Sequence, residues 1–485
     1  MTFRVDGVSP SYSQWQRSCY CDRRLKKITV AVSVLCYWTH NGTKRYDVLC
    51  NEFKRNNYLQ RKNWTIIECG WVPLDSIRMD VEIAKFLMVV GEAGLGKTTL
   101  LESFFKSFKV RLEPRTDDAR APHLVDIVTE SFSFAAPTRW IEDDTALLEL
   151  FWGPTAAFKD FGARFLASCL TRLFEPNSHH TVLVATSGDT GAAVAAAFHQ
   201  RPGFRVVVLY PDGRVSPRQA HQLGAFGDNV ATYRVAGTFD DCQRLVKAAF
   251  ADQELTARHG LVSANSISLG RLLPQMSYYV NAALTARAQG RAAPNFVIPT
   301  GNLGNAFACL LARESGLPIG KVVLASNANR VLPDFLASGQ YEPRDSLATL
   351  ANAMDVGAPS NLERLRHLFA QPADVIRADW VSDEDIRATC QSTFRRTGEI
   401  ICPHTACGVF VRERLRAAGE DGEWVVAATA HAAKFAEVVE PLIGQPIPVP
   451  PALQQLLDQP AHATPLSPTL EALSTALARA ESSAP

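Results

Sequence analysis

From about residue 148 onward, short and uniformly apolar segments alternate with helical patterns. The apolar segments are residues 181–186 (TVLVAT), 204–210 (FRVVVLY), 295–299 (NFVIP), 321–326 (KVVLAS) and 424–429 (WVVAAT). A strand that is apolar at every position is typical of a parallel sheet covered by helices on both faces. The pattern therefore predicts an α/β fold with a largely parallel sheet.

Composition divides the chain. Residues 1–80 are rich in Lys, Arg, Asn, Tyr, Trp and Cys, whereas Ala, Leu, Arg and Gly dominate from about residue 114 onward. We interpret residues 1–84 as an atypical segment, disordered or foreign to the rest of the chain. The Pro-rich stretch that opens residues 445–485 predicts a connector followed by one amphipathic helix.

Charge and cysteine content exclude several classes of function. The 50 basic and 49 acidic residues leave a net charge of +1, which gives no general case for binding nucleic acid or a membrane surface. The longest apolar run, residues 28–38, is shorter than the ~20 residues of a membrane-spanning helix. The 11 cysteines are odd in number and form no metal-binding motif, so we expect free thiols and no metal. We expect an intracellular protein, in the cytoplasm or, in a eukaryote, in a plastid.

Lys159 is the first candidate catalytic residue. It follows residues 153–158 (GPTAAF) and precedes a predicted helix over residues 161–170. Burial in such an apolar turn would lower the lysine pKa and favour the neutral amine, which can form an imine. The alternative is a surface lysine at a helix N-terminus, where the helix dipole disfavours a cation. The segment alone leaves both interpretations open.

Two glycine-bearing loops follow predicted strands and precede predicted helices. They are residues 186–191 (TSGDTG) and residues 300–305 (TGNLGN). Glycine lets backbone N–H groups approach a ligand, and a helix N-terminus favours an anion, although each loop alone is equally typical of a plain connection. A reactive lysine and two anion sites on one sheet indicate a pyridoxal phosphate enzyme, because that cofactor needs a lysine and a phosphate site.

Residues 150–162 (LFWGPTAAFKDFG) closely resemble the lysine motif of threonine synthases, which usually have His in place of Trp152. The resemblance extends over residues 133–444. It implies the pyridoxal phosphate fold of type II, which is similar to the tryptophan synthase β chain and has two parallel-sheet subdomains with the cofactor between them. Eight further motifs occur in the order typical of the family: residues 185–191 (ATSGDTG), 211–216 (PDGRVS), 237–242 (GTFDDC), 265–275 (NSISLGRLLPQ), 299–305 (PTGNLGN), 359–363 (PSNLE), 403–408 (PHTACG) and 428–435 (ATAHAAKF).

The resemblance also implies roles for individual residues. Lys159 would form the imine with the cofactor and move protons, and Thr429 would bind the ring nitrogen. The cofactor phosphate would be held by Gly301, Asn302, Leu303, Gly304 and Asn305. The substrate carboxylate would be held by Ser187, Asp189 and Thr190, and the substrate phosphate by Asn265, Ser266 and Arg271.

The implied reaction converts O-phospho-L-homoserine and water to L-threonine and phosphate. One rival is a pyridoxal phosphate lyase acting on a phospho-amino acid without adding water, which would release 2-oxobutyrate from this substrate. A second is a pseudoenzyme, because the N-terminal domain typical of the family, with its Tyr-x-Ser-Thr-Arg-Gly type of motif, is not found here.

Residues 85–109 contain a P-loop motif that resembles the septin P-loop. The motif G-x-x-x-x-G-K-T places Gly91, Gly96, Lys97 and Thr98 between a predicted strand and helix. A working nucleotide site needs further strands and an acidic residue for Mg²⁺, and residues 85–130 leave no room for them. We therefore interpret residues 85–130 as a fragment and expect no functional GTP or ATP site. A septin-like GTP-binding fusion with an impaired synthase is the remaining alternative.

Overall fold

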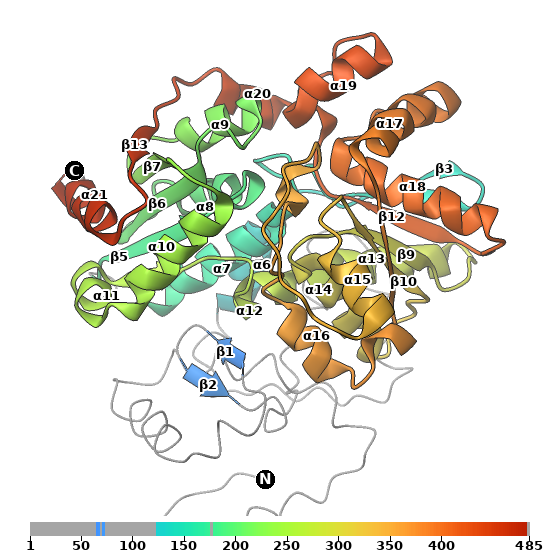
Figure 1. The fold of residues 1–485 in the computed structure, drawn as a ribbon, viewed down its shortest axis with the longest axis horizontal. Coiled ribbons are helices and arrows are strands. Elements are labelled where there is room, and N and C mark those ends of the chain that lie inside the picture. The colour runs from blue at the N-terminus through green and yellow to red at the C-terminus, as the bar shows by residue number, and fades with distance from the viewer. Residues whose placement is uncertain (1–64, 68–69, 73–122, 175–177, 483–485) are drawn as a thin grey trace, which may run out of the picture.

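Two largely parallel sheets, each covered by helices, form the centres of two lobes in the computed structural model, which describes residues 65–67, 70–72, 123–174 and 178–482 (Figure 1). The six-stranded sheet is parallel except for the antiparallel pair β3 and β4. Its order is β11 (Arg377–Trp380), β10 (Val322–Ser326), β9 (Asn295–Pro299), β12 (Trp424–Ala428), β4 (Thr145–Glu149) and β3 (Thr138–Glu142).

All neighbouring strands of the five-stranded sheet are parallel. Side chains from alternate positions of β5 face opposite layers: Val182 packs with α7 and α8, whereas Leu183 packs with α10. Both faces are therefore buried, which explains the uninterrupted apolar runs. The strands are β13 (Thr464–Leu466), β7 (Val230–Val235), β6 (Phe204–Pro211), β5 (His180–Ala185) and β8 (Leu261–Ser263), and the helices are α7 (Lys159–Leu173), α8 (Asp189–Phe198), α9 (Pro217–Gly224), α10 (Phe239–Ala251) and α11 (Gln253–His259).

Helices also cover both faces of the six-stranded sheet. One layer packs on Phe296 and Ile298 of β9, and the other packs on Val297 between them. The first layer contains α13 (Met276–Ala288), α14 (Gly304–Glu314), α15 (Val331–Ser338) and α16 (Leu362–Leu368), and the second contains α17 (Asp383–Thr397) and α18 (Pro403–Ala417). The predicted α/β fold with two parallel-sheet subdomains is confirmed, and each of the five predicted strands is present.

The C-terminal segment contains more structure than the predicted connector and single helix. After α19 (Ala436–Ile443) the chain returns to the five-stranded sheet through α20 (Pro451–Leu457), β13 and α21 (Leu470–Ser482) (Figure 1). Strand β13 pairs in parallel with β7, and Leu473 and Leu477 of α21 are buried against that sheet. A three-residue strand with Pro at its centre is too short to show an apolar periodicity in the sequence. Its extended conformation is fixed by pairing with β7.

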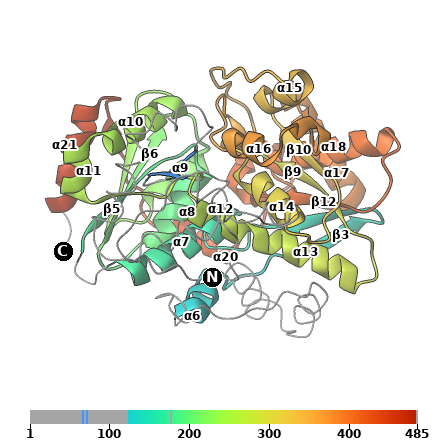
Figure 2. The same cartoon turned by 90° about the horizontal axis from the view of Figure 1, so that it is seen from below.

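The first described helix, α6 (Leu124–Ser131), belongs to the core of the six-stranded sheet. Ile127 and Val128 are buried there, and Figure 2 shows α6 below α7. The predicted boundary at residue 133 would separate α6 from the core on which it packs. Farther upstream, β1 (Thr65–Ile67) and β2 (Gly70–Val72) form an antiparallel pair. The predicted P-loop, with Gly91, Gly96, Lys97 and Thr98, lies outside the described residues.

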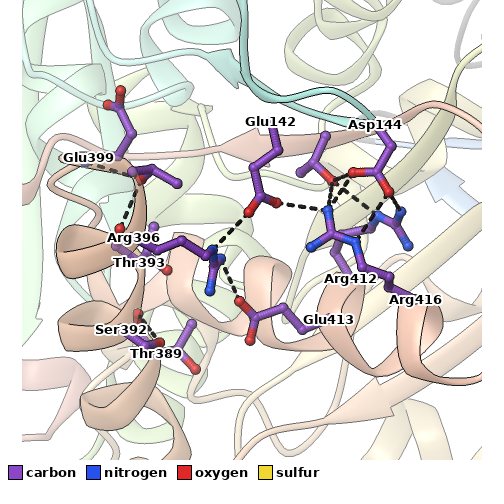
Figure 3. A network of polar contacts seen from close by, with 12 residues as sticks. Glu142, Asp144, Thr389, Ser392, Thr393, Arg396, Glu399, Arg412, Glu413 and Arg416 are labelled. Atoms are coloured by element: carbon purple, nitrogen blue, oxygen red, sulfur yellow. Dashed lines mark hydrogen bonds and ion pairs between the residues drawn. The ribbon is translucent and has the colours of Figure 1, made fainter.

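An ionic network fixes the β3–β4 hairpin to α17 and α18 (Figure 3). Asp144 accepts from Arg412 at 2.6 Å and from Arg416, and Glu142 accepts from Arg396 at 2.7 Å. The buried Arg412 side chain also lies over the ring of Trp424 in β12. These contacts hold the N-terminal end of β4, opposite the end from which the loop to Lys159 begins. Within the described residues, no helix is both long and apolar enough to cross a membrane.

Candidate active site

The carboxyl ends of β9, β12 and β4 lie side by side. Ala428 of β12 pairs with Glu149 of β4, and Val426 pairs with Val297 of β9, with all three strands parallel. Thr429 directly follows β12, the loop over residues 300–303 follows β9, and the loop over residues 150–158 leads from β4 to Lys159. Ligands of open parallel sheets bind at this edge. The topology thus brings the three predicted cofactor-binding segments together.

Backbone hydrogen bonds fix the lysine loop to the extension of β12. Phe158 N donates to Thr429 O at 2.9 Å, and His431 N donates to Ala156 O at 3.0 Å. Asp160 stabilises the turn by accepting from Thr155 N at 2.9 Å and from Thr155 Oγ1 at 2.7 Å. These contacts place the first turn of α7 beside Thr429.

Lys159 is buried, with 9 % of its side chain exposed, so it is not a surface lysine. The pKa of Lys159 is lowered to about 8, chiefly by burial; Asp189 opposes this shift, and the nearby cations Arg271 and Lys434 add to it. Desolvation disfavours the ammonium form because its charge is removed from water. A neutral amine is therefore accessible near neutral pH, as the sequence predicts.

The loop before α14 leaves backbone N–H groups for an anion. Leu303, at the N-cap, has a left-handed φ of 64°, and the side chain of Asn305 caps the turn by accepting from Thr300 Oγ1 and Ala306 N. Asn302 donates to Ser266 Oγ at 2.7 Å. The side chains of Asn302 and Asn305 thus hold the loop, while the first-turn N–H groups have no acceptor within the helix. A helix terminus of this kind suits a phosphate.

The second predicted anion loop connects β5 to α8. Thr186 Oγ1 accepts from Gly188 N at 2.9 Å and from Gly191 N at 2.8 Å, which shapes the loop around Ser187. The side chain of Asp189 instead faces Lys434, 2.7 Å away, and Lys434 holds the pKa of Asp189 well below its usual range against the effect of burial. An ionised carboxylate repels a substrate carboxylate. That this loop holds the substrate carboxylate stays a prediction, in which Asp189 would take part through its backbone N–H because its side chain pairs with Lys434.

The predicted substrate-phosphate residues adjoin the α14 loop. Ser266 accepts from Asn302, so it contacts that loop directly, and Asn265 precedes it. Arg271 lies in α12 (Leu269–Leu272), is 1 % exposed, and donates from Nη1 to Ala264 O at 2.6 Å. A Cβ atom at Gly162 would lie 2.4 Å from Arg271 O, so α7 and α12 pack backbone to backbone here. The structure thus brings Arg271 close to Lys159.

Two buried residues were missed as members of the site. Lys434, in η7 (Ala432–Phe435), and His404, in α18, both lie inside motifs that carry the family resemblance but were given no role. Burial lowers the pKa of His404 to about 4. Its Nε2 accepts from Ala353 N at 3.1 Å. Lys434 could have been recognised from the sequence, because a lysine within an apolar motif is expected to be buried and then needs a buried anion as its partner.

Similarity to known proteins identifies the family to which the chain belongs. Residues 146–430 match the family model described as pyridoxal-phosphate dependent enzyme, and residues 405–477 match threonine synthase, C-terminal. Threonine synthase of Serratia marcescens is 43% identical over 346 residues, which cover 70% of this chain and 80% of that protein. The chain belongs to the threonine synthase family. Threonine synthase of Escherichia coli (strain K12) is 42% identical over 70% of this chain and 78% of its own length.

Solved structures agree with this family. The crystal structure of threonine synthase from Escherichia coli has a TM-score of 0.71 and 37% identity, and covers 82% of this chain and 90% of that chain. The structure of pyridoxal phosphate-bound threonine synthase from Brucella melitensis has a TM-score of 0.70 and 30% identity. The match covers 85% of this chain and 94% of that chain. The chain with the sequence given above is therefore a pyridoxal phosphate-dependent lyase of fold type II that acts on a small molecule.

The residues of this threonine synthase fit pyridoxal phosphate. Lys159 has a buried amine that could form an imine with an aldehyde, and the N-terminus of α14 has backbone donors that could hold a phosphate. Thr429 is 5 % exposed, and its hydroxyl group makes no hydrogen bond within the described part of the chain. A hydroxyl group without a protein partner, at the carboxyl end of a parallel strand, can bind a ligand.

Proposed function

We propose that the enzyme converts O-phospho-L-homoserine and water to L-threonine and phosphate. The observation that carries the proposal is the convergence of Lys159, Thr429 and the α14 N-terminus at the carboxyl ends of three adjacent strands. We also propose that the catalytic unit includes α6 and extends to α21, because both helices pack on the two sheets.

In this proposal each cofactor contact has one role. Lys159 binds the cofactor aldehyde covalently, and the backbone N–H groups of Gly301, Asn302, Leu303, Gly304 and Asn305 hold the cofactor phosphate. The Thr429 hydroxyl group binds the ring nitrogen, and a neutral hydroxyl leaves that nitrogen largely unprotonated. When bound, pyridoxal phosphate withdraws electrons from the carbon atoms next to the substrate amine.

Two anion sites would orient the substrate. Ser187, Thr190 and the N–H groups at the start of α8 bind the carboxylate, where the helix dipole favours an anion. Arg271 binds the phosphate together with Asn265 and Ser266, because a guanidinium group matches phosphate oxygens in geometry and charge.

Proton transfer at three carbon atoms completes the reaction. With the cofactor bound, the Lys159 amine would remove the Cα proton, release it to solvent, and only then remove a Cβ proton, because an ammonium group cannot accept a second proton. Phosphate leaves Cγ with the bonding electron pair, and Cγ later regains a proton. Water adds at Cβ, and a proton returns to Cα. A lysine with a pKa of about 8 can both accept and donate protons near neutral pH.

Product analysis tests this proposal. The full-length protein is incubated with O-phospho-L-homoserine, and phosphate, threonine and 2-oxobutyrate are measured together. We expect one threonine per phosphate released. Phosphate with 2-oxobutyrate instead of threonine would identify the lyase without water addition, and no phosphate release by the cofactor-loaded protein would refute both activities.

A further inference from the structure

One buried carboxylate lies between two buried lysines. Asp189, at the start of α8, is 3 % exposed, and Lys434 is 0 % exposed. Lys434 Nζ lies 2.7 Å from Asp189 Oδ1, whereas no ion pair joins Asp189 to Lys159 among the described residues. A buried anion requires a cationic or hydrogen-bonding partner, so the choice between the two lysines has chemical consequences.

Further contacts hold Lys434 in this position. Its Nζ also donates to Thr155 O at 2.8 Å, in the loop that leads to Lys159. Its backbone carbonyl accepts from Ser216 Oγ at 2.8 Å, at the N-cap of α9. Lys434 therefore joins η7 to the lysine loop, and to α8 through Asp189. These elements come from both sheets.

A glutamine fixes the other side of the carboxylate. Gln219 Nε2 donates to Asp189 Oδ1 at 2.9 Å, while Gln219 Oε1 accepts from Ser216 N at 3.0 Å and from Asn352 Nδ2 at 2.9 Å. The backbone N–H of Ser216 can only donate, which sets the orientation of the amide group. Asp189 thus receives one charged and one neutral donor, and neither comes from Lys159.

We propose that Lys434 is a positioning residue that takes Asp189 as its ion-pair partner and so leaves the Lys159 amine uncommitted for the cofactor. The inference rests on the proposed role of Lys159. An amine attacks an aldehyde with its lone pair, and an ammonium group held by Asp189 has none. Lys434 acts through Asp189 and through its own charge near Lys159, and it needs no contact with the cofactor or the substrate.

The sign of the effect follows from the charges that face Lys159. They are Asp189 on α8, Arg271 on α12 and Lys434 on η7, and the titratable His404 on α18, which is neutral at pH 7, also lies near. Loss of the Lys434 charge removes a cation that lowers the Lys159 pKa. It also leaves the Asp189 carboxylate without its ion-pair partner, and this anion raises the pKa of Lys159. Both changes favour the ammonium form of Lys159.

The test is the pH dependence of cofactor uptake. The full chain, stripped of cofactor, is mixed with pyridoxal phosphate at several pH values, and the rate at which the visible band of the lysine-bound cofactor grows is recorded. For Lys434→Met we expect the midpoint of the rate profile to rise by about one pH unit or more, which is about tenfold slower uptake at pH 7. Lys434→Arg keeps the charge and should keep the midpoint. Lys321→Met, at an exposed pair with Glu420, is the matched control and should change nothing.

Two further variants separate this role from a structural one. Asp189→Asn keeps both cations and removes the anion, so its midpoint should fall below that of the wild type. Asp189→Asn combined with Lys434→Met should return the midpoint toward the wild-type value. A Lys434→Met protein that melts at a lower temperature but keeps the wild-type midpoint would overturn the proposal. A midpoint that stays unchanged in Asp189→Asn would also overturn it, even if Lys434→Met fails to fold. If Lys159→Ala still binds the cofactor covalently, the proposed role of Lys159 fails instead.

Discussion

Gly301→Ala tests whether the loop before α14 holds the cofactor phosphate. A Cβ atom at residue 301 would lie 2.8 Å from Cα and 2.9 Å from the carbonyl oxygen of Met354 in η5 (Asn352–Met354). Both are backbone atoms of a buried turn, so neither can rotate away, and the loop must shift. Overpacking of this kind costs about 1–3 kcal/mol. If the shift displaces the N–H groups from the phosphate, the dissociation constant for pyridoxal phosphate should rise about 5- to 150-fold.

The assay is a titration of cofactor-free protein with pyridoxal phosphate, with thermal melting of the same samples. Gly304→Ala is the control for melting, because its Cβ would lie 3.5 Å from the nearest atom, Ser266 O, which is an ordinary contact. We expect Gly301→Ala to lower both the melting temperature and the cofactor affinity, and Gly304→Ala to leave the melting temperature of the cofactor-free protein nearly unchanged. A Gly301→Ala protein with wild-type melting and wild-type affinity would refute the packing argument.

Three further predictions address the lysine, the substrate and the fold. Lys159→Ala should abolish the visible band of lysine-bound cofactor and all turnover, with unchanged circular dichroism; a retained band would assign the role to another lysine. Arg271→Ala should lower kcat/KM about ten- to a hundredfold, mainly through KM, because a charge-assisted hydrogen bond contributes about 1.5–3 kcal/mol; lost cofactor binding with normal substrate binding would contradict this. Burial lowers the pKa of His404 to about 4, so the unfolded chain binds more protons between pH 6.5 and 4. As the pH falls from 6.5 to 4, the free energy of unfolding of the wild type should therefore decrease by about 3 kcal/mol more than that of His404→Gln. Parallel pH profiles of the unfolding free energy for the two proteins would contradict this prediction.

The N-terminal limit of the catalytic unit is testable by truncation. A chain that begins at residue 123 keeps α6, whereas one that begins at residue 133 loses the buried side chains of Ile127 and Val128 and the carboxylate of Glu130, which pairs with Arg172 and Arg201. Each buried aliphatic side chain contributes about 1.5–3 kcal/mol. The shorter chain should unfold at clearly lower urea concentration. Equal midpoints for the two chains would show that α6 is dispensable.

Patterns that depend only on local sequence predicted much of the fold. The five uniformly apolar runs became strands β5, β6, β9, β10 and β12, because burial on both faces leaves a continuous signal. Lys159 became a candidate because its turn is apolar and bounded by Gly and Pro, but only the family resemblance favoured it over a surface lysine. Strand β13 and helix α6 were not predicted, since their places depend on tertiary contacts with β7 and α7, which local sequence patterns do not show.

The same limit applies to the site. Ser187, Asp189 and Thr190 form one loop, but which of their atoms can bind a substrate depends on Lys434, which is 245 residues beyond Asp189 in the chain (434 minus 189). Sequence spacing cannot show that pairing. Similarly, the loop of Asn302 and Asn305 was predicted as a phosphate site, while the use of their side chains to hold the loop became visible only from Ser266 and Thr300.

The central claim is that Lys159, Thr429 and the α14 N-terminus form a working threonine synthase site. The most direct measurement is the stoichiometry of threonine and phosphate formed from O-phospho-L-homoserine by the cofactor-loaded, full-length protein, with Lys159→Ala as the blank. We predict equal amounts of the two products from the wild type and neither from the variant. Phosphate release without threonine, or threonine formation that survives Lys159→Ala, would contradict the account.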